Sequence, residues 1–214
     1  MDIIFEILAR LINQKNGAVT ESMTDRGIIY KVNYGVSLHT IKKVAEEYAP
    51  DHELAQQLYE RDEREAKLAA VFIEDPQKVT AEQMERWAKD FINVELAEVA
   101  CSQLFYKTPY ALPYSYEWCT VKNIYLQKAG WTMIARISQQ NEATNVQLVL
   151  YLGLAECADL SQAVIQQAVI SALVKFGTRN EELRQAVMGF ASRIKNEGSD
   201  KQLVADEIIS FLSV

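Results

Sequence analysis

Two carboxylates lie one helical turn apart in the stretch 89–105, KDFINVELAEVACSQLF. Glu95 and Glu98 are three positions apart among alanines and branched aliphatic residues, a spacing that puts both on one side of a helix. Such a pair is compatible with a working acid. It is equally compatible with solvated acids at the start of a helix, where the helix dipole favours negative charge. Composition does not decide between the two, so the surrounding elements must.

The other chemically active residue types form no recognisable centre. Cys101, Cys119 and Cys157 show no CxxC or Cys/His spacing, so we expect neither a disulfide framework nor a zinc site. We interpret them as small buried hydrophobic residues. His39 and His52 are too few for a metal site, and we expect them in solvent or in capping roles. The sequence therefore predicts no metal ion and no organic cofactor.

The bulk composition is that of an ordinary globular protein. The chain has 214 residues, of which 49% are hydrophobic and 24% charged, so disorder is not expected. No apolar run is long enough to span a bilayer. The first residues, MDIIFEILARLINQ, have no basic leader, and Glu6 and Arg10 interrupt the apolar stretch. We therefore expect a cytoplasmic protein.

Charge is distributed unevenly along the chain. The net charge of −7 argues against a strong general affinity for nucleic acid. Residues 51–100 hold 13 acids against 6 bases, whereas residues 101–150 hold 4 bases against 2 acids. A basic face of modest size is therefore compatible with the acidic total.

Nearly every segment has the apolar period of an amphipathic helix. Four prolines lie between the periodic segments. Ser37 and Asp51 each stand directly before a periodic segment, in the position of a helix N-cap. Thr80 and Thr144 are each followed three positions later by glutamine, which is the spacing of a capping box. Residues 27–36, GIIYKVNYGV, are ambiguous between a short strand and an irregular connection.

Several predicted helices share a loose pattern of polar residues, an alanine and an apolar run. Ala66, Ala100, Ala129 and Ala168 follow one another at intervals of 34, 29 and 39 residues. These intervals are close to the period of HEAT-type helical pairs. We predict an all-α fold, a HEAT-like helical-repeat solenoid of five or six antiparallel pairs with a concave face, in a single domain over residues 1–214. An irregular helical bundle is the alternative.

Three stretches of the chain resemble the AlkD-like family of DNA alkylation-repair proteins. They are YGVSLHTIKKVAEEY, DHELAQQLYERDEREAKLAAVFIEDPQKVTAEQMERWAKDF and IYLQKAGWTMIA. The likeness runs from residue 34 to 195 and is strongest from 34 to 136. It implies HEAT-like repeats whose concave surface holds duplex DNA. Active members of the family are glycosylases that release cationic N3- or N7-alkylated purines.

The resemblance also implies a particular site. An alkylated purine is already a cationic leaving group, so the site needs a carboxylate to stabilise the oxocarbenium-like sugar. Flat aromatic side chains pack against the lesion, and a cationic side chain holds a phosphate. Active members carry a Trp-Asp-x-x-Asp run after KDF, an arginine in a QRA-like run, and a further tryptophan on the following repeat.

This sequence departs from that set at each position. Val94 stands at the tryptophan, Glu95 at the first aspartate, and Glu98 at the catalytic aspartate. Lys128 stands at the arginine, and Ser171 aligns with the second tryptophan. The signs of the charges are kept but the side chains differ. A glutamate carboxylate reaches further than an aspartate carboxylate, and lysine lacks the bidentate fork of arginine. The aromatic platform is lost, so Glu98 is a candidate catalyst in a degenerate site.

The three tryptophans are not obvious replacements for that platform. Trp87 and Trp131 lie on apolar helical stripes, and we predict that they belong to the core. Trp118 lies in an aromatic-rich connection, PYALPYSYEWCTVKN. It could belong to a stacking surface, although packing between repeats is the favoured interpretation.

Three functions compete. The first is a DNA-binding member of the family with weak or no glycosylase activity, in which Lys122, Lys128 and Arg136 approach phosphates. The second is an active N3/N7-alkylpurine DNA glycosylase that tolerates Glu98 and Lys128. The third is a helical-repeat module whose groove accepts a protein or peptide, which the acidic half of the chain favours. A monomer is expected in each case.

Overall fold

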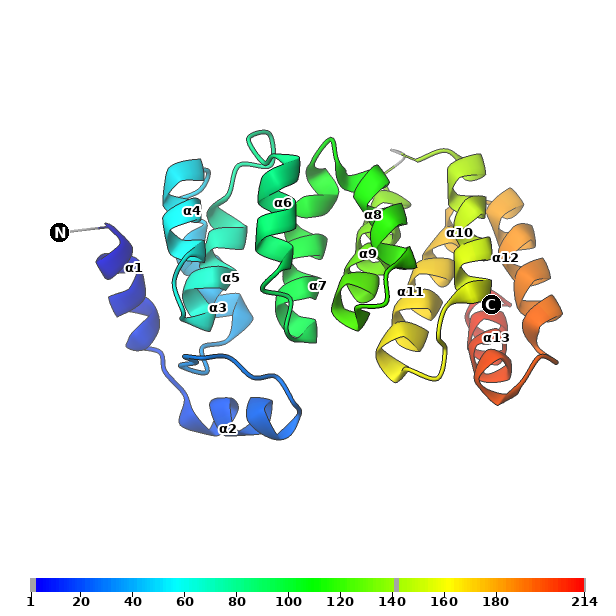
Figure 1. Ribbon diagram of the computed structural model, residues 1–214, viewed down its shortest axis with the longest axis horizontal. Helices are drawn as coiled ribbons and strands as arrows, with labels where there is room; N and C mark the ends of the chain where they lie inside the picture. Colours follow the sequence, from blue (N-terminus) through cyan, green and yellow to red (C-terminus); the bar gives the residue numbers. More distant parts are fainter. Residues whose placement is uncertain (1–2, 141–142, 214) are drawn as a thin grey trace. The chain divides into compact units, whose positions relative to one another are not determined.

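The structure is a computed structural model that describes residues 3–140 and 143–213. Its contacts divide the chain into two compact units, Met1–Pro109 and Tyr110–Val214. Both units consist of helices, and a longer irregular connection joins α2 to α3 in the first unit (Figure 1). Within the described residues no strand is formed, so the all-α prediction is confirmed. The single domain expected over residues 1–214 stays a prediction.

The first unit contains seven α-helices and a short 3₁₀ helix among its described residues. Helix α5 packs against α3, α4 and α7, and α1 packs against α3. Its elements are α1 (Ile3–Ile12), α2 (Gly17–Asp25), α3 (Leu38–Ala45), α4 (His52–Tyr59), α5 (Arg64–Ile73), α6 (Ala81–Ala88), α7 (Val94–Gln103) and η1 (Phe105–Lys107).

The second unit contains six α-helices in its described part, arranged in two layers. Contacts join α9 to α11 and α11 to α13 in one layer, and α8 to α10 and α10 to α12 in the other. Its elements are α8 (Ala111–Thr120), α9 (Ile124–Ile137), α10 (Asn145–Cys157), α11 (Ala163–Arg179), α12 (Glu181–Ile194) and α13 (Ser199–Leu212).

Helix starts follow the capping residues that the sequence indicated. The Ser37 hydroxyl accepts a hydrogen bond from the Thr40 amide at 3.1 Å, and the Asp51 carboxylate accepts one from the Leu54 amide at 3.0 Å. Thr144 forms a complete capping box with its glutamine at the start of α10. Each of these bonds satisfies an amide that the helix itself leaves without an acceptor.

The start of α6 differs from the predicted capping box. Thr80 accepts a hydrogen bond from the Gln83 amide at 3.2 Å, as expected. The Gln83 side chain, however, donates to the buried carboxylate of Glu74 at 2.7 Å. Glu74 also lies 2.7 Å from His52 Nδ1 and accepts from Gln56 Nε2 at 2.7 Å. This buried acid therefore ties α4, the end of α5 and α6 together.

The segment 27–36 is an irregular connection rather than a strand. Val32 forms one isolated parallel bridge with Glu63, and the Arg64 amide donates to Val32 O at 2.9 Å. Gly35 has a φ of 70°, and a Cβ there would lie 2.1 Å from the Asn16 carbonyl oxygen. The close crossing of these two chain segments therefore requires glycine at this position.

Aromatic packing forms the centre of each unit. The Tyr59 and Trp87 rings stack with centroids 3.8 Å apart in the first unit, and Trp131 packs edge-on against Tyr151 in the second. Trp87 and Trp131 are fully buried, which confirms their assignment to the core. Trp118 is also buried, so packing rather than an open stacking surface is its role.

The cysteine assignment is correct for two residues and wrong for the third. Cys101 and Cys119 are buried, whereas Cys157 is exposed at the end of α10. His39 is exposed, as expected. In the described part of the chain, no three His, Cys, Asp or Glu side chains gather in a group that could hold a metal ion. Nor does any described helix combine the length and apolar character needed to cross a membrane.

Candidate functional site

The helix α7 carries the two carboxylates from which the sequence argument started. Asn93 caps it, because its side-chain oxygen accepts hydrogen bonds from the Glu95 amide at 3.0 Å and the Leu96 amide at 3.3 Å. Val94 is half-buried, and Glu98 is exposed one turn further on. The two glutamates therefore meet different surroundings although they share a helix face.

Glu95 is held by an arginine from α5. Arg64 Nη2 donates to Glu95 Oε1 at 2.6 Å, and Arg64 Nε donates to Glu95 Oε2 at 2.7 Å, which makes the pair bidentate. The Arg64 side chain is 3% exposed and the Glu95 side chain 18%. Bidentate Arg–carboxylate pairs of this kind combine charge with fixed geometry. Both oxygens of Glu95 are therefore engaged inside the protein.

A tyrosine from the connection after α2 completes the contact. Tyr30 Oη donates to Glu95 Oε2 at 2.9 Å and lies 3.2 Å from Asn93 Oδ1. Asn93 Nδ2 in turn donates to the Ile29 carbonyl at 3.2 Å. Burial, together with the nearby Glu95 charge, raises the pKa of Tyr30 far above its ordinary value. The phenol therefore stays protonated and remains a donor to Glu95.

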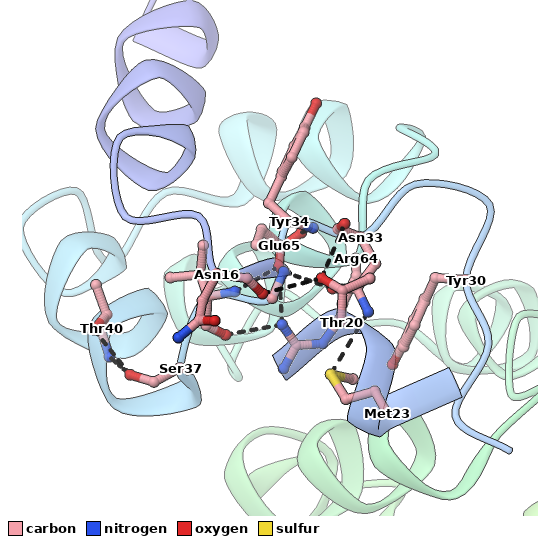
Figure 2. Close-up of polar contacts among 12 residues, drawn as sticks. Asn16, Thr20, Met23, Tyr30, Asn33, Tyr34, Ser37, Thr40, Arg64 and Glu65 are labelled. Carbon is pink, nitrogen blue, oxygen red and sulfur yellow. Dashed lines mark hydrogen bonds and ion pairs between the residues drawn. The ribbon is translucent and has the colours of Figure 1, made fainter. Parts of the chain in front are cut away.

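Arg64 also belongs to a buried network with its sequence neighbour. Its Nη1 donates to Glu65 Oε1 and to the Val36 carbonyl, both at 2.9 Å. The Glu65 carboxylate accepts from the Tyr34 and Val36 amides, both at 3.1 Å. Figure 2 shows Arg64 and Glu65 beside the segment that carries Asn33 and Tyr34. The start of α5 thus fastens the segment 32–36 and Glu95 at one place.

The charge state of Arg64 follows from these contacts. Burial opposes a charged guanidinium, but the hydrogen bond and charge of Glu95, reinforced by Glu65, raise the pKa of Arg64. The arginine is consequently a permanent cation between two carboxylates. Glu95 is not a solvated acid at a helix start, so that interpretation is wrong for this residue. Glu98 is exposed on the same helix.

Sequence reasoning missed Arg64 and Tyr30 as partners of Glu95. A signal for Arg64 was present, because Arg64, Leu68 and Val71 have the spacing of one helix face and the two apolar residues are buried. An arginine in line with a buried stripe points inward and needs a carboxylate there. No comparable signal singled out Tyr30, which lies in an irregular segment.

The remaining predicted site residues lie in the second unit. Lys128 and Arg136 are half-buried on α9, Lys122 is exposed just before it, and Ser171 is exposed on α11. Helices α9 and α11 pack against each other, so these residues belong to one layer of the unit. Val94, Glu95 and Glu98 belong to α7 of the first unit.

The helices α9 and α11, which we call the α9–α11 layer, carry charges of one sign. Besides Lys128 and Arg136 on α9, Lys175 and Arg179 lie on α11, and neither helix contains an aspartate or glutamate. Arg179 Nη1 donates to the Ala143 carbonyl at 2.7 Å, so part of this charge holds the connection before α10. Two adjacent helices with four bases and no acid favour contact with an anion.

The fold is that of the HEAT-like helical-repeat proteins. One similar solved structure is described as "A new family of proteins related to the HEAT-like repeat DNA glycosylases with affinity for branched DNA structures". Its TM-score is 0.81 at 16% identity, over 98% of this chain and 95% of that chain. The likeness shows a shared fold and confirms the predicted HEAT-like repeat architecture.

The family follows from the sequence itself. A family model described as DNA alkylation repair enzyme matches residues 7–208. The chain therefore belongs to the DNA alkylation repair enzyme family, and the resemblance seen in the sequence is confirmed. A search of curated proteins found no match.

Proposed function

We propose that this protein binds DNA through its α9–α11 layer and excises N3- or N7-alkylated purines slowly or not at all. Membership of the family and the HEAT-like fold support the DNA-binding part. The observation that carries it is the charge of α9 and α11, which together hold four bases and no acid. Phosphate oxygens are the DNA groups that such a surface attracts.

The expected binding is weak and depends strongly on salt. Lys128 offers a point charge to a phosphate and lacks the fork that an arginine would supply. Lys122 and Arg136 extend the basic surface along α9 and its start. Contacts of this kind release counterions and carry no base sequence, so different sequences should bind about equally.

The proposal of weak excision has its own support. Glu95, at the first aspartate position of active relatives, is occupied by Arg64 and Tyr30. Val94 and Ser171 offer no aromatic face where those relatives have tryptophan. Misplacing a reacting group by roughly 1 Å can cost about 100-fold in rate, and weakened charge stabilisation can cost about 100- to 1,000-fold. Glu98, exposed on α7 at the catalytic aspartate position of those relatives, is the candidate catalyst.

Branched DNA is the first class of substrate to compare with a linear duplex. The similar solved structure belongs to a family described as having affinity for branched DNA structures. A surface that contacts phosphates without reading bases distinguishes nucleic acids by shape. We therefore include branched DNA in the proposed range of ligands.

The binding part is tested by gel shift and fluorescence anisotropy on a linear duplex and a four-way junction. Binding should be measurable near 50 mM salt and fall steeply by about 200 mM. Lys128→Ala should lower affinity about three- to ten-fold for all sequences and reduce the salt slope by about one. Lys78→Ala, at an exposed lysine between α5 and α6, is the matched control and should have no effect. No complex at low salt, or equal affinity for Lys128→Ala, contradicts the DNA-binding proposal.

The excision part is tested by base release from a methylated duplex. We expect negligible release of 3-methyladenine and 7-methylguanine from both the wild type and Glu98→Gln, with DNA binding retained. Robust release by the wild type that Glu98→Gln abolishes would show that the site is intact. In that case Glu98 would be the charge-stabilising catalyst, and the weak-excision proposal would be wrong.

A further inference from the structure

The second unit has an apolar surface on α8 and α10, which belong to the layer opposite α9 and α11. Helix α10, NVQLVLYLGLAEC, is apolar on all sides, which is typical of a helix surrounded by protein. Only Leu148, Tyr151 and Ala155 are buried among its described residues. A second stripe at Val146, Val149 and Leu150 faces solvent with 74%, 39% and 57% of each residue exposed. This stripe has helical spacing and no covering element in the described chain.

An open cavity lies next to that stripe, between α8 and α10. It measures about 330 Å³ and is lined by Leu112, Pro113, Tyr116, Gln147, Leu150 and Tyr151. Its walls are held by packing and hydrogen bonding. Tyr116, which is 44% exposed, packs edge-on against the buried Tyr151 ring with centroids 5.6 Å apart. Tyr151 Oη lies 2.7 Å from Ser115 Oγ.

We define the α8–α10 patch as Tyr116, Val146, Val149 and Leu150 together with this cavity. A row of exposed apolar residues beside a preformed apolar pocket is the pattern of a surface that receives anchor side chains. Such anchors lie at i, i+3, i+4 and i+7 when an amphipathic helix docks in a groove. The shape of the patch thus fits a helical segment.

The charges around the patch determine which helical segment fits. Helices α8 and α10 contain the acids Glu117 and Glu156 and no lysine or arginine. Glu182, exposed at the start of α12, accepts a hydrogen bond from Asn145, the residue before Val146. Acids therefore lie on both sides of the patch, on α8 and on α12.

The nearest bases on α12 are turned to other partners. Arg184 Nη1 donates to the Leu212 carbonyl at 3.0 Å, and Arg193 Nη1 pairs with Glu156 at 2.6 Å beyond the other end of the patch. The rim is consequently acidic. DNA phosphates are repelled by it, and a second copy of this chain, with net charge −7, would bring the same acids against each other.

We propose that the α8–α10 patch is a docking site for an amphipathic helical segment of a partner protein that carries lysine or arginine beside its apolar anchors. An anchor side chain enters the cavity next to Tyr116, and the basic residues face Glu117 and Glu182. Because this layer is separate from α9 and α11, the protein can hold DNA and a protein partner on different layers of the second unit.

The test uses the full chain and three designed, fluorescein-labelled helical peptides. One has leucine anchors at helical spacing and flanking lysines, one has the same anchors and flanking glutamates, and one has alanine in place of the leucines. Fluorescence anisotropy should detect binding of the lysine-flanked leucine peptide. The alanine peptide should not bind, and the glutamate-flanked peptide should bind at least several-fold more weakly.

Two variants examine the patch itself. Leu150→Asp should weaken binding of the lysine-flanked peptide at least about tenfold, since a central apolar contact is lost. Val146→Asp should do the same, and its new charge lies in the first turn of α10, where the helix dipole tolerates it. Phe211→Asp, at a residue 61% exposed on α13, is the matched control and should leave binding unchanged.

Exchange of the rim charges gives the most specific result. The double variant Glu117→Lys/Glu182→Lys should prefer the glutamate-flanked peptide, with circular dichroism showing that it stays folded despite the bond lost between Asn145 and Glu182. Equal binding of both charged peptides, or equal loss in Phe211→Asp and Leu150→Asp, overturns the proposal. So does sedimentation that shows a wild-type dimer which Leu150→Asp converts to a monomer, because the occupant would then be a second copy. None of these readouts involves DNA, so their failure leaves the proposed DNA binding standing.

Discussion

The two units of this protein differ in whether they bury charged side chains. Among the described residues every buried charged side chain lies in the first unit, namely Arg64, Glu65 and Glu74. The buried polar residues of the second unit are Ser115 and Ser138. Its interior is otherwise apolar, and the four bases on α9 and α11 lie at half-buried positions. The first unit therefore buries charged side chains between its helices, whereas ion pairs of the second unit, such as Arg193–Glu156, lie at its surface.

This difference changes what the acidic character of the first half means. Residues 51–100 have a large excess of acids, but Glu65, Glu74 and Glu95 are engaged by buried donors. A count of acids therefore overstates the negative surface that a ligand would meet. The charge of a sequence segment therefore predicts its affinity for a charged ligand only when acids paired inside the protein, such as these three, are left out.

The largest expected effect is at Arg64. Arg64→Ala leaves Glu65 and Glu95 without their cation, and losing one partner of a buried ion network costs about 3–5 kcal/mol of unfolding free energy. Arg193→Ala breaks an exposed pair in the second unit and should lower the unfolding free energy far less, because solvent screens that pair. Urea unfolding measures both. Equal losses of unfolding free energy in the two variants would show that the buried charges of the first unit contribute no more to stability than the exposed charges of the second.

A smaller effect should follow from a glycine in the second unit. A Cβ at Gly130 would lie 2.7 Å from both the Cys119 amide nitrogen and the Ser115 carbonyl oxygen, where α8 and α9 touch. Gly130→Ala should therefore cost about 1–3 kcal/mol through overpacking.

Gly153 on α10 provides the matched control, since a Cβ there meets nothing within 4 Å. Gly153→Ala should stabilise the protein by about 0.5–1 kcal/mol because alanine favours a helix. Thermal and urea unfolding of both variants check this. If Gly130→Ala does not change the unfolding free energy, the close contact between α8 and α9 at this glycine does not limit the stability of the second unit.

The smallest effect is expected at Tyr30. Tyr30→Phe removes one donor to Glu95 while Arg64 still pairs with that carboxylate, so about 1 kcal/mol is lost at neutral pH. Because the pKa of Tyr30 is raised above its ordinary value of 10.0 in the folded protein, its stabilisation is complete below pH 10 and declines as the pH rises further.

The stability difference between the wild type and Tyr30→Phe should consequently shrink as the pH rises from about 10 to about 11. Tyr59 and Tyr151 are also buried with raised pKa values, but both proteins contain them. Urea unfolding as a function of pH separates the contribution of Tyr30. A constant difference across that range would show that its hydroxyl is not buried against Glu95.

Local features were predictable from the sequence and distant contacts were not. The helices, the caps at Ser37, Asp51 and Thr144, and the buried Trp87 and Trp131 depend on residues a few positions apart, so periodicity and spacing sufficed. The fold and family could be predicted because the resemblance covers most of the chain.

The candidate site was predictable only as a set of positions. The role of Glu95 depends on Arg64 and Tyr30, which lie 31 and 65 positions away, and no spacing rule relates them. An apolar sequence alone predicts burial, whereas Cys157 and the second stripe on α10 are exposed. Their exposure depends on which neighbouring elements cover the helix, and the sequence does not show this.

The bond between Tyr30 and Glu95 has a consequence for the order in which the nascent chain folds. The two residues are 65 positions apart, whereas helical repeats rely mainly on contacts between neighbours. At about 5–20 residues per second, a ribosome needs roughly 3–13 seconds to make the intervening chain. During that time α2 and residues 27–36 have left the ribosome without the acceptor that docks Tyr30. In a chain that stops before α7, α5 already holds residues 32–36. Residues 27–31 would still be exposed to proteases, and they should become protected only when synthesis passes Glu95.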